Sequence, residues 1–130
     1  MRRSQRGFTL IEVLIVMVII TILAGISIAM YGNGVTQAEE ATLKTDLKEM
    51  REAIDAYHAD KQKWPTTLDA LVTEKYIRQV PVDPTTRAAD WQTTPSEPDP
   101  SNPLDEPGIS DVHSASDRVS PRTQTPYSEW

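Results

Sequence analysis

The chain has 130 residues, no cysteine and a formal net charge of −6 at pH 7. This length allows one small domain, and the lack of cysteine excludes disulfides and thiolate chemistry. The part from Met30 onward carries 10 Lys/Arg against 18 Asp/Glu. That acidic excess argues against a nucleic-acid-binding surface, which needs a basic patch.

A basic segment opens the sequence, and its charges are Arg2, Arg3 and Arg6. Residues 8–30 then form an apolar run with one charge, Glu12. As a helix this run would be about 35 Å long, enough to cross a bilayer core of about 30 Å. The positive-inside rule predicts a cytoplasmic N-terminus and an external remainder. An ordinary cleaved signal peptide is the alternative, with weak small-x-small sites between Ala24 and Ala29.

The boundary between the two segments reads Arg6-Gly7-Phe8-Thr9-Leu10-Ile11-Glu12-Val13. This string resembles the class III signal of type IV pilins and pseudopilins. The resemblance implies that a prepilin peptidase removes a leader, residues 1–7, by cutting between Gly7 and Phe8. It also implies that the same peptidase N-methylates Phe8. The run 8–30 would then stay in the mature protein as a transmembrane and assembly helix.

Glu12 is the unusual residue of the apolar run. A carboxylate within a bilayer helix costs roughly 2.5–3.5 kcal/mol on insertion scales, so it needs a partner or a route to the headgroups. Cleavage would create an ammonium at Phe8, four residues earlier. We hypothesise that Glu12 meets the Phe8 amine of a neighbouring subunit during assembly. The alternative is a lone acid that snorkels to the headgroups.

The remainder, residues 31–130, is predicted to be a head that begins with an amphipathic helix over residues 35–61. Gly32, Asn33 and Gly34 precede this helix and could bend or partly melt the chain. Apolar residues then recur at spacings of 4, 3, 4 and 3, which places them on one helical face. They are Leu43, Leu47, Met50, Ile54 and Tyr57. Opposite charges four residues apart predict the pairs Lys48–Glu52 and Arg51–Asp55 on the exposed faces.

Trp64-Pro65 should end this helical region, and residues 66–69 look like the cap of a short helix that runs to about Lys75. The proline-punctuated stretch that follows ends in P-x-D-P at residues 81–84. The W-P-T-T string at residues 64–67 and this turn resemble the major pseudopilins of type II secretion. The fold class is therefore expected to be α+β and pilin-like, with a long N-terminal helix on a small, loop-rich antiparallel sheet.

Eight of the ten prolines lie between Pro84 and Pro126, so a disordered tail is one interpretation of this half of the head. Sparse apolar residues favour an ordered domain with two or three short strands instead. Tyr127-Ser128-Glu129-Trp130 suggests a final strand whose aromatic side chains pack back on the head.

Residues 107–117 resemble the calcium-binding C-terminal loop of major pseudopilins. Calcium prefers several hard oxygens, both carboxylate and carbonyl. The predicted ligands are Asp111, Val112, Ser114 and Asp117. Arg118, Val119 and Ser120 replace the family's following glycines, and an ordinary Asx/Ser turn is the competing interpretation. No other cofactor is predicted.

No catalytic constellation is recognisable, so an enzyme is not predicted. His113 beside Asp111 and Ser114 invites a hydrolase interpretation, but the three residues share one short loop without an evident oxyanion hole.

The resemblance implies a structural subunit of a type II secretion pseudopilus. Its expected place is the inner membrane, crossed once, with the head in the periplasm and subunits assembled into a periplasmic filament. Implied partners are other pseudopilins, the prepilin peptidase and the inner-membrane secretion platform, with no nucleic acid. Two alternatives stay open at this point. One is a type IV pilin for adhesion, motility or DNA uptake, and the other is a membrane-anchored binding protein that does not polymerise.

Overall fold

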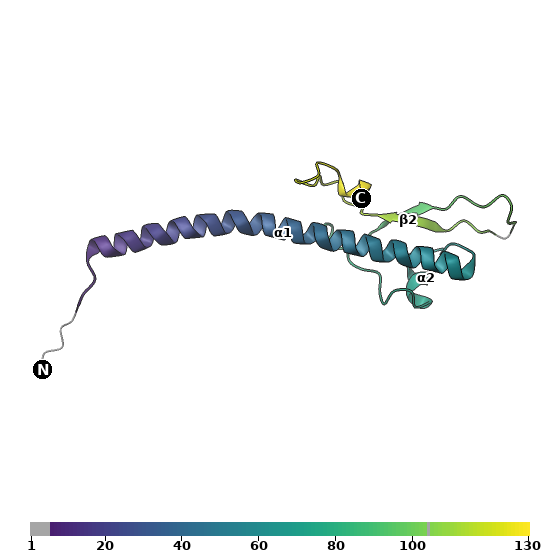
Figure 1. The fold of residues 1–130 in the computed structure, drawn as a ribbon, viewed down its shortest axis with the longest axis horizontal. Coiled ribbons are helices and arrows are strands. Elements are labelled where there is room, and N and C mark those ends of the chain that lie inside the picture. The colour runs from purple at the N-terminus through teal and green to yellow at the C-terminus, as the bar shows by residue number, and fades with distance from the viewer. Residues whose placement is uncertain (1–5, 104) are drawn as a thin grey trace, which may run out of the picture. The chain divides into compact units, whose positions relative to one another are not determined.

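The computed structural model describes residues 6–103 and 105–130. Residues 1–5 of the predicted leader, with Arg2 and Arg3, and Leu104 lie outside the described residues. The elements are α1 (Leu10–Lys61), α2 (Leu68–Thr73), β1 (Gln92–Pro95), β2 (Ile109–His113) and a 3-10 helix η1 (Tyr127–Glu129), as Figure 1 shows. The chain divides into two compact units, Met1–Gln37 and Ala38–Trp130. The α+β class predicted from the sequence is confirmed.

Gly32, Asn33 and Gly34 are helical, although the sequence suggested a bend or partial melting there. Each glycine disfavours a helix by only about 1 kcal/mol relative to alanine, which a helix of 52 residues tolerates. The Thr36 hydroxyl also donates to the Gly32 carbonyl at 3.2 Å.

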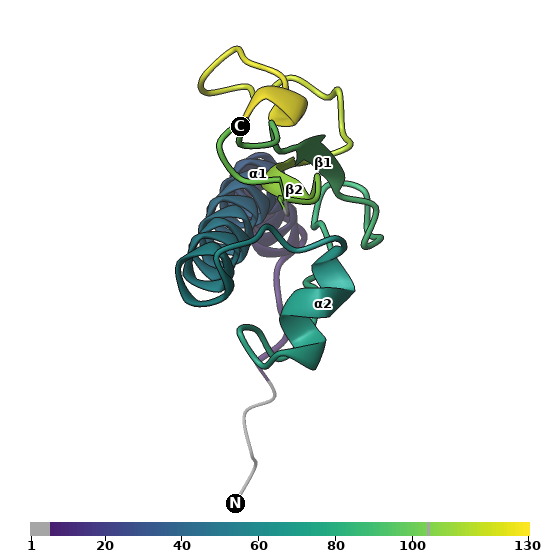
Figure 2. The same ribbon diagram turned by 90° about the vertical axis from the view of Figure 1, so that its right-hand side faces the viewer.

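The core of the second unit forms around one face of α1. The five apolar residues predicted to share that face are all buried, and Leu43, Met50 and Ile54 are 0% exposed. They join a single cluster with residues from α2, β2, η1 and the segment between α2 and β1: Leu71, Ile77, Trp91, Ile109, Val112 and Tyr127. Figure 2 looks nearly along α1 and shows the sheet and α2 at different positions around this part of the helix. Their packing is therefore what buries the amphipathic face.

The sheet consists of β1 and β2, which pair antiparallel from Gln92↔His113 to Pro95↔Ile109 with an irregularity at Thr94/Pro95. Two described strands agree with the predicted two or three. Just before β2, Gly108 lies against residues 64–65, and a Cβ on it would come within 2.7 Å of the Pro65 carbonyl oxygen. The Ile109 amide donates to that same oxygen at 2.8 Å. The glycine thus lets β2 approach the segment that follows α1.

The short helix α2 begins where the capping pattern predicted. Thr67 is its N-cap, and the Thr67 side chain accepts a hydrogen bond from the Ala70 amide at 3.2 Å. The helix ends at Thr73 instead of near Lys75, because Lys75 takes a left-handed φ of 64°.

The predicted final strand is wrong. Residues 127–129 form η1, with the Trp130 amide bonded to the Tyr127 carbonyl at 3.1 Å. Pro126 precedes it and has no amide hydrogen for a ladder, which suits a turn better than a strand. The aromatic packing was predicted correctly, because Tyr127 is 1% exposed and its ring meets the Trp130 ring edge-on at 5.0 Å.

Candidate functional site

The predicted processing site lies directly before α1. Gly7, Phe8 and Thr9 are outside the helix, and Phe8 is 83% exposed. The Glu12 amide donates to the Thr9 hydroxyl at 3.2 Å and to the Thr9 carbonyl at 3.1 Å. Thr9 therefore behaves as an N-cap with Glu12 at the third helical position, the spacing of a capping box. A carboxylate in this first turn also complements the positive end of the helix dipole.

Phe8 and Glu12 line the same shallow hollow on the surface of α1, together with Val13, Val16 and Met17. The structure thus brings the predicted methylation residue and the predicted assembly residue onto one face. Neither the cleavage nor the role of Glu12 is tested by this geometry, and both stay predictions.

Apolar side chains line the first half of α1, and no other described residue of the first unit covers them. Among the described residues, α1 contains a stretch long and apolar enough to cross a bilayer, with a mean hydropathy of 2.9 and none of it buried. Its two hydroxyl side chains are satisfied locally, since Thr21 and Ser27 each donate to the carbonyl four residues earlier at 2.8 Å. Such a surface needs lipid or another apolar surface to cover it.

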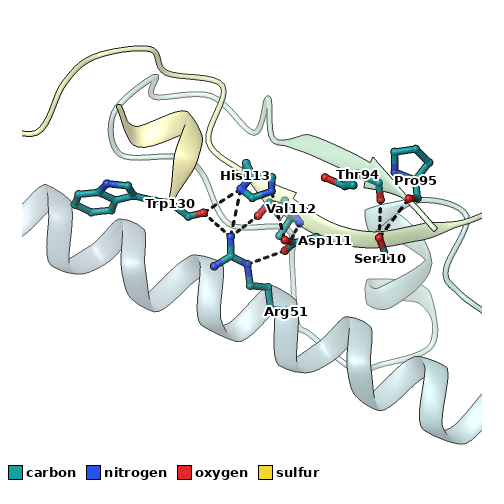
Figure 3. A network of polar contacts seen from close by, with 8 residues as sticks. All are labelled: Arg51, Thr94, Pro95, Ser110, Asp111, Val112, His113 and Trp130. Carbon is teal, nitrogen blue, oxygen red and sulfur yellow. Dashed lines mark hydrogen bonds and ion pairs between the residues drawn. The ribbon is translucent and has the colours of Figure 1, made fainter. Parts of the chain in front are cut away.

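Two of the predicted calcium ligands are bound to Arg51 of α1, as Figure 3 shows. The Arg51 Nε donates to Asp111 Oδ1 at 2.8 Å, and Arg51 Nη2 donates to the Val112 carbonyl at 2.9 Å. His113 Nε2 lies 3.3 Å from the other carboxylate oxygen of Asp111. Both oxygens of Asp111 therefore face nitrogen atoms of the protein.

The other two predicted ligands point to different surroundings. Ser114 is 0% exposed, and its hydroxyl donates to the buried Asp83 carboxylate and accepts from the Ser116 amide at 3.1 Å. Asp117 is exposed. Among the described residues no three His, Cys, Asp or Glu side chains gather as a metal would require. The four residues do not form the oxygen shell that calcium needs, so the residues present do not fit the ion. Calcium binding itself stays an untested prediction.

One charged residue of α1 that the sequence analysis did not single out, Glu40, also contacts the C-terminal part of the head. Glu40 is 2% exposed and accepts hydrogen bonds from the Ser120 hydroxyl at 2.6 Å and the Tyr127 hydroxyl at 3.0 Å. Burial, and then the hydrogen bond to Glu40, raise the pKa of Tyr127 above its ordinary value. A signal was available, because Glu40 lies three residues before Leu43 and so continues the apolar face.

Comparisons with known proteins agree with these features. The family model described as "Prokaryotic N-terminal methylation motif" matches residues 2–28. The "Type II secretion system core protein G" of Klebsiella michiganensis is 34% identical, over 64% of this chain and 70% of the relative. The protein of the same name from Pseudomonas aeruginosa is 35% identical over the same shares, and that from Aeromonas hydrophila is 33% identical over 64% and 69%. The chain belongs to the core protein G family of type II secretion systems.

This membership confirms the resemblance to major pseudopilins. The methylation motif covers the leader boundary and most of the apolar run. The similarity to core protein G extends over 64% of the chain. An apolar N-terminal helix in a pseudopilin is consistent with a membrane-anchored subunit. No solved structure matches the chain.

Proposed function

We propose that this chain is a structural subunit of a type II secretion pseudopilus, which polymerises through the first half of α1 to help drive protein export across the outer membrane. The observation that carries the proposal is an uncovered apolar helix that starts directly after Gly7-Phe8 and contains one carboxylate, Glu12. The names and the identity levels of the related core proteins support it. The proposed role is structural and not enzymatic.

Processing and topology follow the same logic. A prepilin peptidase would cut between Gly7 and Phe8 and methylate the new amine. The subunit would then wait in the inner membrane with its N-terminus in the cytoplasm and its head in the periplasm, because the arginines of the leader resist translocation. The inner-membrane secretion platform would take subunits from this pool into a periplasmic filament.

Assembly exchanges one apolar environment for another. In the bilayer, lipid chains cover the apolar side chains of α1, and in a filament the same side chains can pack against other copies. A contact between different surfaces of identical subunits produces a helical filament when its rotation does not close a ring. Burial in the filament would leave the Glu12 carboxylate without water, and the Phe8 ammonium of a neighbouring subunit would compensate its charge.

Replacing Glu12 by leucine tests this assignment. Glu12→Leu should keep membrane insertion, since the helix becomes more apolar, and should abolish filaments in a sheared or cross-linked fraction. The exchange Glu49→Leu, at an exposed acid of the head, is the matched control and should leave filaments intact. If Glu12→Leu assembles as well as the control, the charge-pairing step is wrong. If the unchanged chain forms no filament when its secretion system is active, the proposed function is wrong.

A further inference from the structure

The C-terminal part of the head, residues 109–130, is attached to α1 through two charged side chains. Arg51 contacts its beginning and its last residue, whereas Glu40 contacts its middle. Both charged residues belong to the second compact unit, as does everything they touch. We call these two groups of contacts the Arg51 clamp and the Glu40 clamp.

The Arg51 clamp gathers oxygen atoms around one positive charge. Arg51 Nε donates to Asp111 Oδ1, and Arg51 Nη2 donates to the Val112 carbonyl and also to the backbone oxygen of Trp130, the last at 2.5 Å (Figure 3). His113 Nδ1 lies 3.0 Å from the same Trp130 oxygen. A guanidinium suits this task because its rigid fork of donors reaches several acceptors at once and keeps its charge at any ordinary pH.

The Glu40 clamp has the opposite charge, because a carboxylate lies at its centre and accepts the hydrogen bonds. The carboxylate is almost fully buried and takes hydrogen bonds from the hydroxyls of Ser120 and Tyr127. Arg122 Nε stands 3.9 Å from its second oxygen. Hydroxyl donors and a nearby guanidinium are what a buried carboxylate needs to stay satisfied. This clamp holds both ends of the turn that the Val119↔Pro126 bridge closes.

We propose that this head fastens its C-terminal segment with the Arg51 and Glu40 clamps and folds without a calcium ion. The carboxylate and carbonyl that calcium would draw together, Asp111 and Val112, are already joined by a cation that the chain itself supplies. Ser114 is held by Asp83, and Asp117 faces solvent. The guanidinium thus takes the structural part that the sequence had suggested for a metal. The inference concerns the stability of the head and goes beyond its assembly.

Thermal unfolding of the full chain in detergent micelles, followed by near-ultraviolet circular dichroism, tests the proposal. Three conditions are compared: no addition, excess EGTA, and excess calcium chloride. The midpoint of the unchanged chain should be the same in all three. Arg51→Met should lower the midpoint by about 4–8 °C or more in every condition. Lys48→Met is the matched control, because Lys48 forms an exposed ion pair in which its Nζ lies 3.7 Å from Glu52 Oε1. This variant should change the unfolding midpoint little.

The rate of trypsin cleavage measures how firmly residues 109–130 are held to α1, because Arg118 and Arg122 are exposed residues of this segment. Arg51→Met should speed cleavage after these two arginines by roughly 5–30-fold, while Lys48→Met should not. Arg51→Lys should fall between, since lysine keeps the charge but loses the fork.

Two results would overturn the proposal. One is a midpoint of the unchanged chain that falls by several degrees in EGTA and recovers with calcium. The other is an Arg51→Met chain whose cleavage and midpoint match those of Lys48→Met. The first comparison needs no variant, so it decides even if Arg51→Met does not fold. Neither result depends on filament formation, so failure here is distinct from failure of the proposed function.

Discussion

Individual charged residues of α1 meet very different surroundings in the head. Glu40 is buried among hydroxyl donors, and the partly exposed Arg51 lies among oxygen acceptors, so each has a favourable partner set. Asp46 has no such set. Its partial burial, and then the nearby charges of Glu49 and Asp83, raise its pKa above the ordinary aspartate value. An acid with a raised pKa favours folding when protonated, and this stability is lost as the pH rises through the raised value.

Asp46→Asn should therefore stabilise the head slightly at pH 7. The gain should be no more than about 0.5 kcal/mol, because Asp46 is only partly buried and solvent screens its neighbours. It should vanish below about pH 3, where Asp46 is largely protonated in both the folded and the unfolded chain. Urea unfolding at the two pH values measures it, with Asp55→Asn, an exposed acid of the same helix, as the control. An equal or larger gain at the lower pH would contradict the assigned cause.

Most residue-level predictions that rest on helical periodicity are correct. The five apolar residues of the α1 face are buried, and Lys48 pairs with Glu52 as expected. The predicted Arg51–Asp55 pair is replaced by Arg51–Asp111, across 60 residues of sequence. Exposed pairs four residues apart contribute little, so a partner offered by the fold outcompetes them, and sequence spacing cannot reveal such a partner.

Among the elements, β2 depends most on a close approach. Its first residue bonds to the Pro65 carbonyl, and this contact requires Gly108 to pass within a side chain's width of residues 64–65. Gly108 is the one glycine of the sequence beyond Gly34, but nothing in a proline-rich stretch indicates which loop it lies against. Sequence pattern likewise failed to reveal the backbone conformation of η1. The packing of its aromatic side chains on the head was predicted correctly, but the predicted strand is a 3-10 helix.

Gly108→Ala should destabilise the head by about 1–3 kcal/mol, because the new methyl group would overlap backbone atoms that cannot move away easily. The midpoint of chemical unfolding of the full chain in micelles measures the loss. Gly34→Ala is the matched control, since a Cβ there meets nothing within 4 Å and alanine favours a helix. Equal midpoints for the two variants would show that the approach at Gly108 is not required.

The whole molecule consists of two compact units that differ in how many of their apolar side chains are exposed. The described residues of the first expose nearly all of their apolar side chains, which need an apolar covering, whereas the second buries an apolar cluster and is rich in acidic residues. This division was predictable, because hydropathy alone separates a bilayer helix from a polar head. The clamps of the C-terminal segment were not, because they join residues far apart in the sequence.

The mass of the mature N-terminus tests the central claim most directly. The chain is expressed with an active prepilin peptidase, recovered from the membrane and measured intact and after fragmentation. Processing as a pseudopilin predicts a first residue of Phe8 that carries one methyl group, and the full leader when the peptidase is inactivated. A chain that still begins with its arginines beside an active peptidase, or one that starts beyond residue 30, would contradict the account.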